Sequence, residues 1–307
     1  MQALISIIIP VYNEEGNIAL ITSRLTDVLK TLDYQYEIIF VDDGSSDNTL
    51  GDIKATATID QHIFFISFSR NFGHQNALKA GLDMGRGDCV ISMDGDLQHP
   101  PGLLPQLIKK WEEGYDIVYT IRKDDTKLPL LKRKSSSLYY SFLNRLSDIE
   151  IENGTADFRL VDKRVAALLS NFTEADLFWR GLVKWLGFKQ IGIEYIPSER
   201  EIGASKYTFK KMLQFALKGI TSFSIKPLTV AVYLGFAFSF LSLLYIPYVL
   251  ISQYMGVAVS GWASTIVTIV FFGGLQLMIL GIIGTYLGKL FMQSKQRPHY
   301  IIREKNM

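Results

Sequence analysis

The feature that most constrains this chain is a long stretch without charge near its C-terminal end. No Asp, Glu, Lys or Arg occurs between Lys226 and Lys289. Two apolar runs lie inside the stretch, at residues 228–252 and 262–288, separated by a polar and small-residue break at 253–261. Each run reaches the roughly 20 residues that a helix needs to cross a hydrocarbon core. The pattern predicts two transmembrane helices, and a buried helical hairpin in a soluble core is the alternative.

The charges around this stretch predict its orientation. Basic residues flank both ends and are absent from the 253–261 loop; they are Lys206, Lys210, Lys211, Lys218 and Lys226 on one side, and Lys289, Lys295, Arg297, Arg303 and Lys305 on the other. Because basic loops stay in the cytoplasm, both flanks are predicted to be cytoplasmic. Segments 132–146 and 206–223 mix basic with aromatic and aliphatic residues. This favours helices lying on the bilayer surface over ordinary amphipathic packing helices.

Composition excludes several classes of protein. Hydrophobic residues make up 48% of the 307, the mean hydropathy is +0.17, and the excess lies in the uncharged stretch. A net charge of +2 gives no case for a nucleic-acid partner. The single cysteine, Cys89, excludes an intramolecular disulfide and a Cys-rich metal site. The first residues lack a basic leader, so no signal peptide is expected.

The first 200 residues alternate strand-like and helix-like segments. Strands are predicted at 5–10, 37–41, 63–67, 89–93 and 117–119. Helices are predicted at 18–32, 76–84 and 103–113, with Ser46 and Asp47 capping another after the second strand. This order predicts an α/β domain with a mostly parallel sheet and helices on both faces. The expected organisation is a cytosolic domain at 1–200, a juxtamembrane segment at 201–226, a transmembrane hairpin at 227–289 and a cytosolic tail at 290–307.

Three acidic clusters follow predicted strands at the edge where such sheets bind ligands. Glu14 follows the first strand, the Asp42–Asp43 pair the second, and Asp94-x-Asp96 the fourth. Gathered carboxylates repel one another, so a cation or a donor-rich ligand is expected among them. An Asp-x-Asp at a strand end suits a hard divalent ion that also holds a pyrophosphate. For the Asp42–Asp43 pair, a turn with a helix cap is the alternative.

Two common nucleotide-binding signatures are missing from the sequence. No Gly-x-Gly-x-x-Gly follows the first strand, and no Walker A lysine loop occurs. This argues against NAD enzymes and P-loop NTPases.

Six ordered motifs carry a family resemblance: IIPVYNE (8–14), VDDGSSD (41–47), SRNFG (69–73), DGDLQ (94–98), DFRL (157–160) and REIGASKY (200–207). The first four resemble family 2 glycosyltransferases, which implies the Rossmann-like GT-A fold. The last two resemble the polyprenyl-phosphate branch of that family. That branch includes dolichol-phosphate mannose synthase and the bactoprenol glucosyltransferases of O-antigen modification, and the two predicted spans match the bactoprenol type.

The resemblance implies a role for each matching residue. The expected nucleotide-sugar site comprises Pro10, Tyr12, Glu14, Asp42, Asp43, Asp94 and Gln98. Asp94 and Asp96 are expected to hold Mg²⁺ or Mn²⁺. The expected catalytic residues are Asp157, Asp96, Arg200 and Lys206. The expected lipid-phosphate site comprises Arg122, Lys132, Arg133, Ser135, Arg159 and Ser205.

The implied activity is metal-dependent inverting transfer of a sugar, glucose from UDP-glucose by resemblance, to undecaprenyl phosphate at the cytoplasmic face of the bacterial inner membrane. A phosphate acceptor is mostly dianionic at pH 7 and needs little help from a base. We therefore expect Asp157 to orient a cation such as Arg159 or Arg122. The alternatives are a GDP-mannose-dependent synthase of the dolichol type and a non-catalytic nucleotide- or lipid-binding scaffold. A homo-oligomer is compatible with the sequence.

Some residues are interpreted as having no part in the chemistry. Processive polymer synthases carry Gln-x-x-Arg-Trp, which this chain lacks, so the Trp179–Arg180 pair is interpreted as a chance likeness. The four histidines, His62, His74, His99 and His299, lack metal-binding spacing and are interpreted as surface or loop residues.

Topology provides the first prediction. Because Lys and Arg flank the uncharged stretch on both sides, cysteine-accessibility labelling should find positions near Met1 and Met307 on the cytoplasmic side. A cysteine at Ser260, in the uncharged loop, should react from outside the cell and serves as the control. Labelling of Met307 from outside would contradict the two-span topology.

Overall fold

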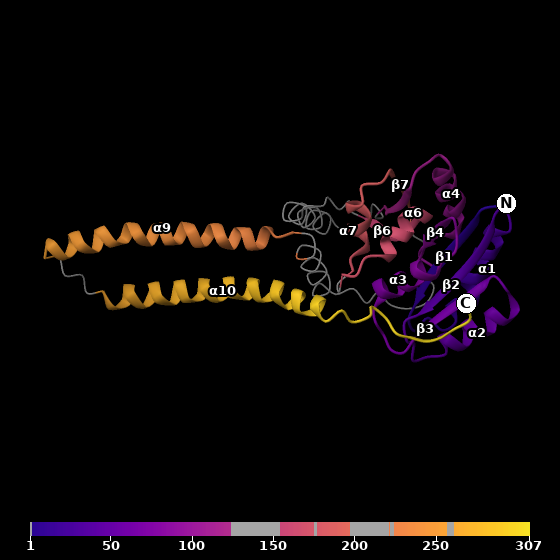
Figure 1. Ribbon diagram of the computed structural model, residues 1–307, viewed down its shortest axis with the longest axis horizontal. Coiled ribbons are helices and arrows are strands. Elements are labelled where there is room, and N and C mark those ends of the chain that lie inside the picture. Colours follow the sequence, from indigo (N-terminus) through magenta and orange to yellow (C-terminus); the bar gives the residue numbers. More distant parts are fainter. Residues whose placement is uncertain (1, 124–153, 175–176, 197–220, 222–223, 257–260) are drawn as a thin grey trace.

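The computed structural model describes residues 2–123, 154–174, 177–196, 221, 224–256 and 261–307. Within them, an α/β domain lies at one end of the molecule and two long helices project from it (Figure 1). The strands are β1 (Leu4–Val11), β2 (Gln35–Asp42), β3 (Ile63–Phe68), β4 (Cys89–Ser92), β5 (Ile117–Arg122), β6 (Thr155–Asp162), β7 (Gln190–Tyr195) and β8 (Ile302–Lys305). The helices are α1 (Asn17–Leu29), α2 (Thr49–Ile59), α3 (His74–Met84), η1 (Pro101–Leu103), α4 (Leu104–Glu112), α6 (Lys163–Ser170), α7 (Trp179–Trp185), α9 (Lys226–Tyr254) and α10 (Trp262–Ser294).

The strands form one mixed sheet in the order β7-β5-β6-β4-β1-β2-β3-β8. Parallel pairing joins β1 to β2 and β4, β2 to β3, and β5 to β7. β6 and β8 run antiparallel to their neighbours. The predicted mostly parallel α/β sheet is confirmed, and the five predicted strands form with ends shifted by three residues or fewer. β6, β7 and β8 were not predicted.

Helices cover both faces of the sheet and create two separate cores. On one face, α1, α2 and α4 pack apolar side chains such as Ile21, Ile53 and Leu107 against the strands. On the other face, α3, α6 and α7 do so with side chains such as Leu78 and Leu169. Burial on both sides explains why β1 is apolar at every position but Ser6 rather than alternating apolar with polar residues. The resulting sheet is a rigid platform for the loops at its edge.

The loop before α2 corrects one detail of the capping prediction. The N-cap residue of α2 is Asn48, whose side chain makes no cap hydrogen bond, so the predicted capping by Ser46 and Asp47 is wrong. Asp47 Oδ1 accepts hydrogen bonds from the Thr49 amide, 3.1 Å, and the Thr49 hydroxyl, 2.5 Å, just before the helix. The Ser46 amide donates to Asn13 Oδ1 at 2.9 Å. Ser46 therefore joins two loops at the edge of the sheet.

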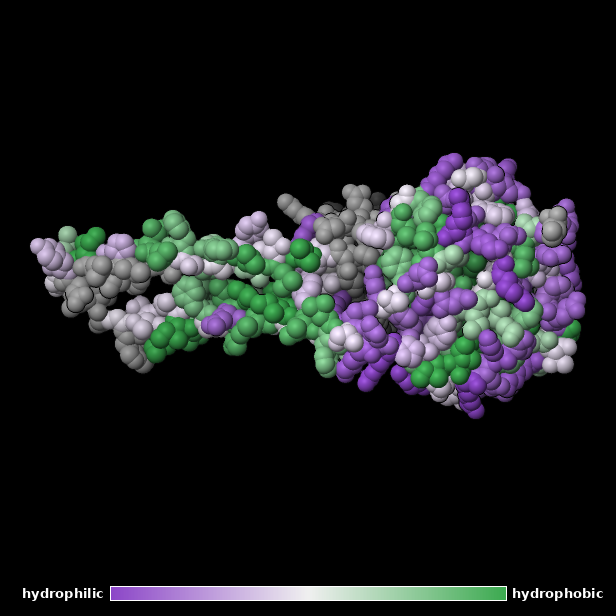
Figure 2. Space-filling model, viewed as in Figure 1, coloured by the Kyte–Doolittle hydropathy of each residue, from purple (hydrophilic) through white to green (hydrophobic). Residues whose placement is uncertain are grey.

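The uncharged stretch forms the two projecting helices. α9 has 29 residues and α10 has 33, and Phe238 of α9 packs against Phe271 and Phe272 of α10, with ring centroids 5.6 and 5.8 Å apart. Figure 2 shows hydrophobic residues over much of this surface, in contrast to the hydrophilic domain. Among the described residues, one helical segment, Ser264–Ser294, is long and apolar enough to cross a membrane. Its most apolar 18-residue window has a mean hydropathy of 2.5, and none of that window is buried inside the protein.

The chain returns to the sheet after α10. Residues 302–305, expected within a separate tail, form β8 and pair with β3 at the edge of the sheet. The C-terminal end of the described chain therefore belongs to the same domain as its N-terminal strands (Figure 1).

Gly44 provides a test of how closely the edge loops pack. Its φ is +69°, and a Cβ at this position would lie 2.5 Å from the Arg70 carbonyl carbon. Gly44→Ala should therefore destabilise the protein by at least about 1–2 kcal/mol, measured as a lower unfolding midpoint in detergent. Gly102→Ala is the matched control, since nothing lies within 4 Å of its Cβ position. Equal midpoints for the two variants would contradict this close packing.

Candidate active site

The carboxyl ends of β1 and β2 lead into two loops that are bonded together. Four consecutive amides, those of Asn13, Glu14, Glu15 and Gly16, donate to side chains of the second loop and the start of α2. The acceptors are Ser45 Oγ, Thr49 Oγ1, Asp47 Oδ2 and Asp52 Oδ2, at 2.9–3.2 Å. Parallel neighbouring strands bring these loops to one edge, and the hydrogen bonds then fix their relative positions.

Asp42 and Asp43 are buried and bonded internally. Asp42 accepts the Ser45 amide at 3.0 Å and the Ser67 hydroxyl at 2.8 Å. Asp43 accepts the amides of Phe72 and Gly73 at 2.6 and 2.9 Å. Burial raises the pKa of Asp43, and these amides offset only part of that rise. The structure thus gives Asp43 a role in holding the 69–73 loop and Asp42 a role in joining the β2 loop to β3, alongside the nucleotide contact that the resemblance implies.

Asp94, just beyond β4, lies between two histidines. His74 Nε2, from the first residue of α3, is 2.8 Å from Asp94 Oδ1. His99 Nδ1 accepts the Asp94 amide at 3.0 Å, which places the proton of a neutral His99 ring on Nε2, 3.7 Å from Asp94 Oδ2. Burial raises the pKa of Asp94, but the two imidazoles outweigh it and the pKa lies below its usual range. Asp94 is therefore a carboxylate at neutral pH.

The same contact acts on His74 with the opposite sign. Burial lowers the pKa of His74, but the hydrogen bond and charge of Asp94 raise it more, so the net shift is upward. The pair favours the form in which the imidazole is protonated and the carboxylate is ionised.

Asp157, on β6, is held by two arginines. Arg180, at the start of α7, makes a two-point contact with it, from Nε to Oδ1 at 3.1 Å and from Nη2 to Oδ2 at 2.9 Å. Arg159 Nη2 is 3.0 Å from Oδ1. Burial raises the pKa of Asp157, but Arg180 and Arg159 outweigh it and hold the pKa far below its usual range. Asp157 thus contacts Arg159, one of the two cations named for it, and Arg180; that it orients a cation toward an acceptor phosphate stays a prediction.

Strand register brings the two carboxylates face to face. β4 and β6 are antiparallel, with Ser92 opposite Arg159. Continuing that register by two residues places Asp94 opposite Asp157. The Ser92 hydroxyl donates to the Asp157 carbonyl oxygen at 2.6 Å. This hydrogen bond joins β4 to β6 just before the position of the two carboxylates. The centre of the site is thus a pair of carboxylates, one flanked by imidazoles and the other by guanidiniums.

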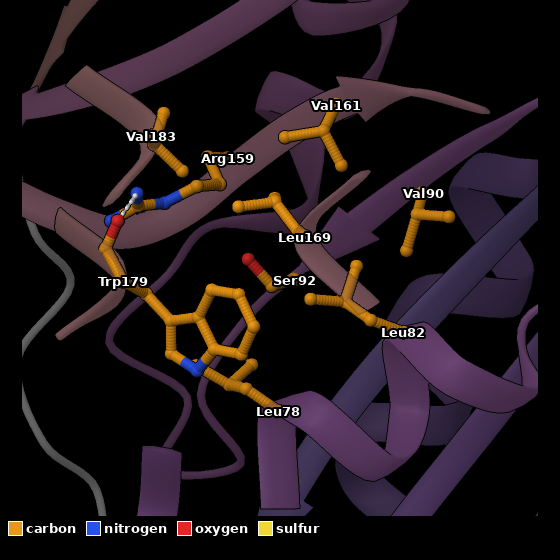
Figure 3. Close-up of a pocket in the computed structure, with 9 residues that line it drawn as sticks. All are labelled: Leu78, Leu82, Val90, Ser92, Arg159, Val161, Leu169, Trp179 and Val183. Carbon is orange, nitrogen blue, oxygen red and sulfur yellow. Dashed lines mark hydrogen bonds between the residues drawn. The ribbon is translucent and has the colours of Figure 1, made fainter. Parts of the chain in front are cut away.

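Arg159 is placed differently from the acceptor contact that was expected. Its side chain is only 6% exposed, and it also donates to the carbonyl oxygens of Ala156, 3.1 Å, and Trp179, 3.4 Å. Figure 3 shows its guanidinium directed at the Trp179 carbonyl beside a small, mainly apolar cavity of about 20 Å³. These internal contacts make Arg159 a support for Asp157 rather than a direct ligand of an acceptor.

Asp94 and Asp96 are the two carboxylates expected to hold a divalent ion. Asp96 Oδ1 accepts the Gln98 amide at 3.2 Å, and Leu97 between them has a φ of +63° and is buried, so the turn is tightly specified. Among the described residues, no group of three or more His, Cys, Asp or Glu side chains could hold a metal. Two carboxylates fit Mg²⁺ or Mn²⁺ when the other oxygen ligands come from a bound pyrophosphate and water.

The remaining predicted residues fall into two groups. At the edge of the sheet, Tyr12 is 41% exposed, Pro10 is buried in β1 and Arg122 is exposed at the end of β5. Glu14 Oε2 accepts the Asn17 amide group at 2.6 Å. The other group, Lys132, Arg133, Ser135, Arg200, Ser205 and Lys206, lies outside the described residues.

Three site residues were missed by the sequence reasoning. His74 and His99 were interpreted as surface or loop residues, yet both contact Asp94, and His99 is only 4% exposed, stacked on Phe158. The Trp179–Arg180 pair was dismissed as a chance likeness, yet Trp179 is buried and Arg180 holds Asp157. The sequence offered one signal: His74 directly follows the SRNFG motif (69–73), and His99 directly follows the DGDLQ motif (94–98).

The chain belongs to glycosyl transferase family 2, whose sequence profile matches residues 6–169. It is 41% identical to the uncharacterised glycosyltransferase YkcC of Bacillus subtilis (strain 168), over 97% of this chain and 93% of that protein. It is 39% identical to the bactoprenol glucosyl transferase of Shigella phage SfV, over 98% of both chains. Among solved structures, mannosyl-3-phosphoglycerate synthase of Rubrobacter xylanophilus aligns with a TM-score of 0.49 at 14% identity, over 70% of this chain and 71% of that chain.

The lowered pKa of Asp157 predicts how its replacement behaves with pH. A carboxylate whose pKa falls on folding stabilises the protein above its unfolded pKa of about 3.9, and loses that effect only as the pH falls toward the folded value. Asp157→Asn should therefore cost a constant unfolding free energy from about pH 6 to 8, and its glycosyl transfer should fall without a change in the shape of the pH–rate profile. Asp88→Asn, at the opposite end of β4, is the control.

The contrary result is equally specific. Loss of an ionisation limb near neutrality, with recovery of the Asp157→Asn variant at high pH, would make Asp157 a general base and contradict the ion-pair interpretation.

Proposed function

We propose that this chain transfers glucose from UDP-glucose to undecaprenyl phosphate, with inversion at the anomeric carbon. The observation that carries the proposal is the state of Asp157, which two arginines keep ionised and therefore weakly basic. A hydroxyl acceptor needs a base to remove its proton, whereas a phosphate monoester is mostly dianionic at pH 7. The site therefore suits a phosphate oxygen as the nucleophile.

The relatives and the C-terminal helices support a lipid as the carrier of that phosphate. A relative that matches 98% of this chain is a bactoprenol glucosyl transferase. Helices α9 and α10 lie C-terminal to the domain's first seven strands, and both are long and free of charge beyond their first turn except for Lys289. We propose that both helices span the bacterial inner membrane, so that the domain lies on the cytoplasmic surface where the lipid phosphate emerges.

The proposed reaction is a single displacement. The phosphate oxygen attacks the anomeric carbon of the sugar, and the bond to the nucleoside diphosphate breaks on the opposite face. Bringing one anion to another requires cations, and we propose that Arg122 and Arg180 supply part of this charge near Asp157, together with Lys132, Arg133, Arg200 and Lys206. The hydroxyls of Ser135 and Ser205 are proposed to donate hydrogen bonds to the lipid phosphate. A divalent ion held by Asp94 and Asp96 would stabilise the charge of the departing diphosphate.

Asp157 contributes orientation rather than proton transfer in this scheme. Its two-point contact fixes the plane of the Arg180 guanidinium, and such planar pairs hold oxyanion ligands with defined geometry. The buried Arg159 contacts the same carboxylate at Oδ1, from the interior of the domain. Pro10, Tyr12, Glu14 and Gln98, at the same edge as Asp42 and Asp43, are proposed to contact the nucleotide and the donor sugar.

The test is transfer of radiolabel by the purified full-length protein in nanodiscs. Label from UDP-glucose should reach undecaprenyl phosphate, and the product should carry the β-anomer. Asp96→Asn should reduce transfer by on the order of 10²-fold, because it removes a charge facing the leaving group. Asp88→Asn, exposed at the other end of β4, should retain activity.

Each other outcome rejects part of the proposal. Transfer from GDP-mannose alone would replace the donor, and an α-linked product would reject the single displacement. Binding of nucleotide and lipid without any transfer would indicate a non-catalytic scaffold.

A further inference from the structure

The segment after α10 connects a long apolar helix to the edge of the catalytic sheet. α10 ends at Ser294, and β8 begins at Ile302 and pairs antiparallel with β3. Figure 1 shows this segment, in yellow, leaving the end of α10 and crossing the domain to the side where β3 lies. We call residues 295–307 the tail.

The tail is bonded to β3 along the whole strand. Beyond the strand pairing, Asn306 Oδ1 accepts the Phe65 amide at 2.6 Å, and Asn306 Nδ2 donates to the Ile63 carbonyl at 3.3 Å. Glu304 forms an ion pair of 2.6 Å with Lys54 of α2. The tail thus covers the edge of β3 and is also bonded by side chains to β3 and α2.

Tyr300 anchors the tail to a second element, α3. Its ring stacks on the buried Phe68 with centroids 5.1 Å apart and planes within 11°. Its hydroxyl donates to Asp83 Oδ2 at 2.8 Å, near the C-terminal end of α3. The residue therefore joins β3 and α3 where they diverge.

The tail also holds the loop that leads to the other end of α3. The Ser69 amide donates to the Ile301 carbonyl at 3.0 Å, and Phe68 packs edge-on against Phe72 at 5.7 Å. Phe72 and Gly73 are the residues whose amides Asp43 accepts. The next residue is His74, which contacts Asp94.

These contacts form one continuous path from the tail to the carboxylate that faces Asp157. One side of the 69–73 loop is fixed by Asp43 and the other by the tail, and the loop ends at His74. Gly44 packs against Arg70 and Asn76 Nδ2 donates to the Phe72 carbonyl at 2.8 Å on the domain side of the loop, and the tail adds a contact at the start of the loop, at Ser69.

We propose that the tail is a positioning element for the donor site, which sets His74 against Asp94 through the 69–73 loop and α3. Because the tail is continuous with α10, the placement of the domain against that helix and the shape of the donor site are coupled. The inference rests on the proposed donor site at Asp94 and Asp96 but does not depend on which sugar is carried.

The experiment measures nucleotide binding and transfer separately in the full-length protein in nanodiscs. Tyr300→Ala removes the stack on Phe68 and the bond to Asp83. Its Kd for UDP with Mn²⁺ and its KM for the nucleotide-sugar should both rise roughly tenfold, or about 1.4 kcal/mol, while the KM for undecaprenyl phosphate stays unchanged. Amide hydrogen exchange at Phe72 and Gly73 should accelerate in the same variant.

Matched variants separate positioning from a loss of fold. Arg303→Ala alters an exposed residue of the tail, in β8, and should leave the Kd for UDP and the KM for the nucleotide-sugar unchanged. Tyr300→Phe keeps the stack and loses only the bond to Asp83, so it should show a smaller rise in Kd than Tyr300→Ala. If Tyr300→Ala does not fold, the test is whether the Kd for UDP is higher in Tyr300→Phe than in Arg303→Ala.

The outcomes distinguish failure of this inference from failure of the proposed function. A lower unfolding midpoint in Tyr300→Ala with an unchanged Kd for UDP would make the tail a purely structural cover and overturn the inference. If the wild-type protein binds GDP in place of UDP, the proposed donor is wrong and the tail is tested with GDP. Wild-type binding of neither nucleotide would overturn both.

Discussion

The site is organised around the Asp157 carboxylate, which two arginines hold at the start of a strand facing Asp94. Two carboxylates at the ends of adjacent strands repel each other, and burial strengthens that repulsion. Arg159 and Arg180 offset it on one side, and His74 and His99 on the other. Removing Arg159 or Arg180 would leave the buried Asp157 carboxylate without one of its partners, which is more costly than never having buried the pair.

This constraint explains the arrangement of several distant elements. α7 must place Arg180 beside Asp157, where β4 and β6 end their pairing. Trp179 fixes that helix, because its ring nitrogen donates to the Gln75 carbonyl of α3 at 2.7 Å. α3 begins at His74, so the same helix positions a partner of Asp94 and a contact of α7. The two carboxylates are therefore supported by elements that also support each other.

Much of the fold could be predicted from local pattern. The strands β1 to β5 are mostly apolar because both faces of the sheet are covered, and a run of isoleucines such as Ile7–Ile9 is visible without knowledge of partners. β6 was not predicted because its sequence includes Asp157 and Arg159, whose charges mask the strand pattern. β8 was not predicted because Arg303 and Lys305 look like the solvated end of a chain, although Ile302 and Glu304 make the contacts with the domain.

The sequence by itself determined the α/β class, the acidic strand ends and the two uncharged runs, since each is a property of consecutive residues. It also determined that Asp157 pairs with a cation, because Arg159 is only two residues away. Only the tertiary structure decided that Arg180 is the second partner, that His74 and His99 flank Asp94, and that the tail completes the sheet. These residues are distant in sequence and meet only because antiparallel register and helix packing set which side chains face each other, and neither is encoded in a local pattern.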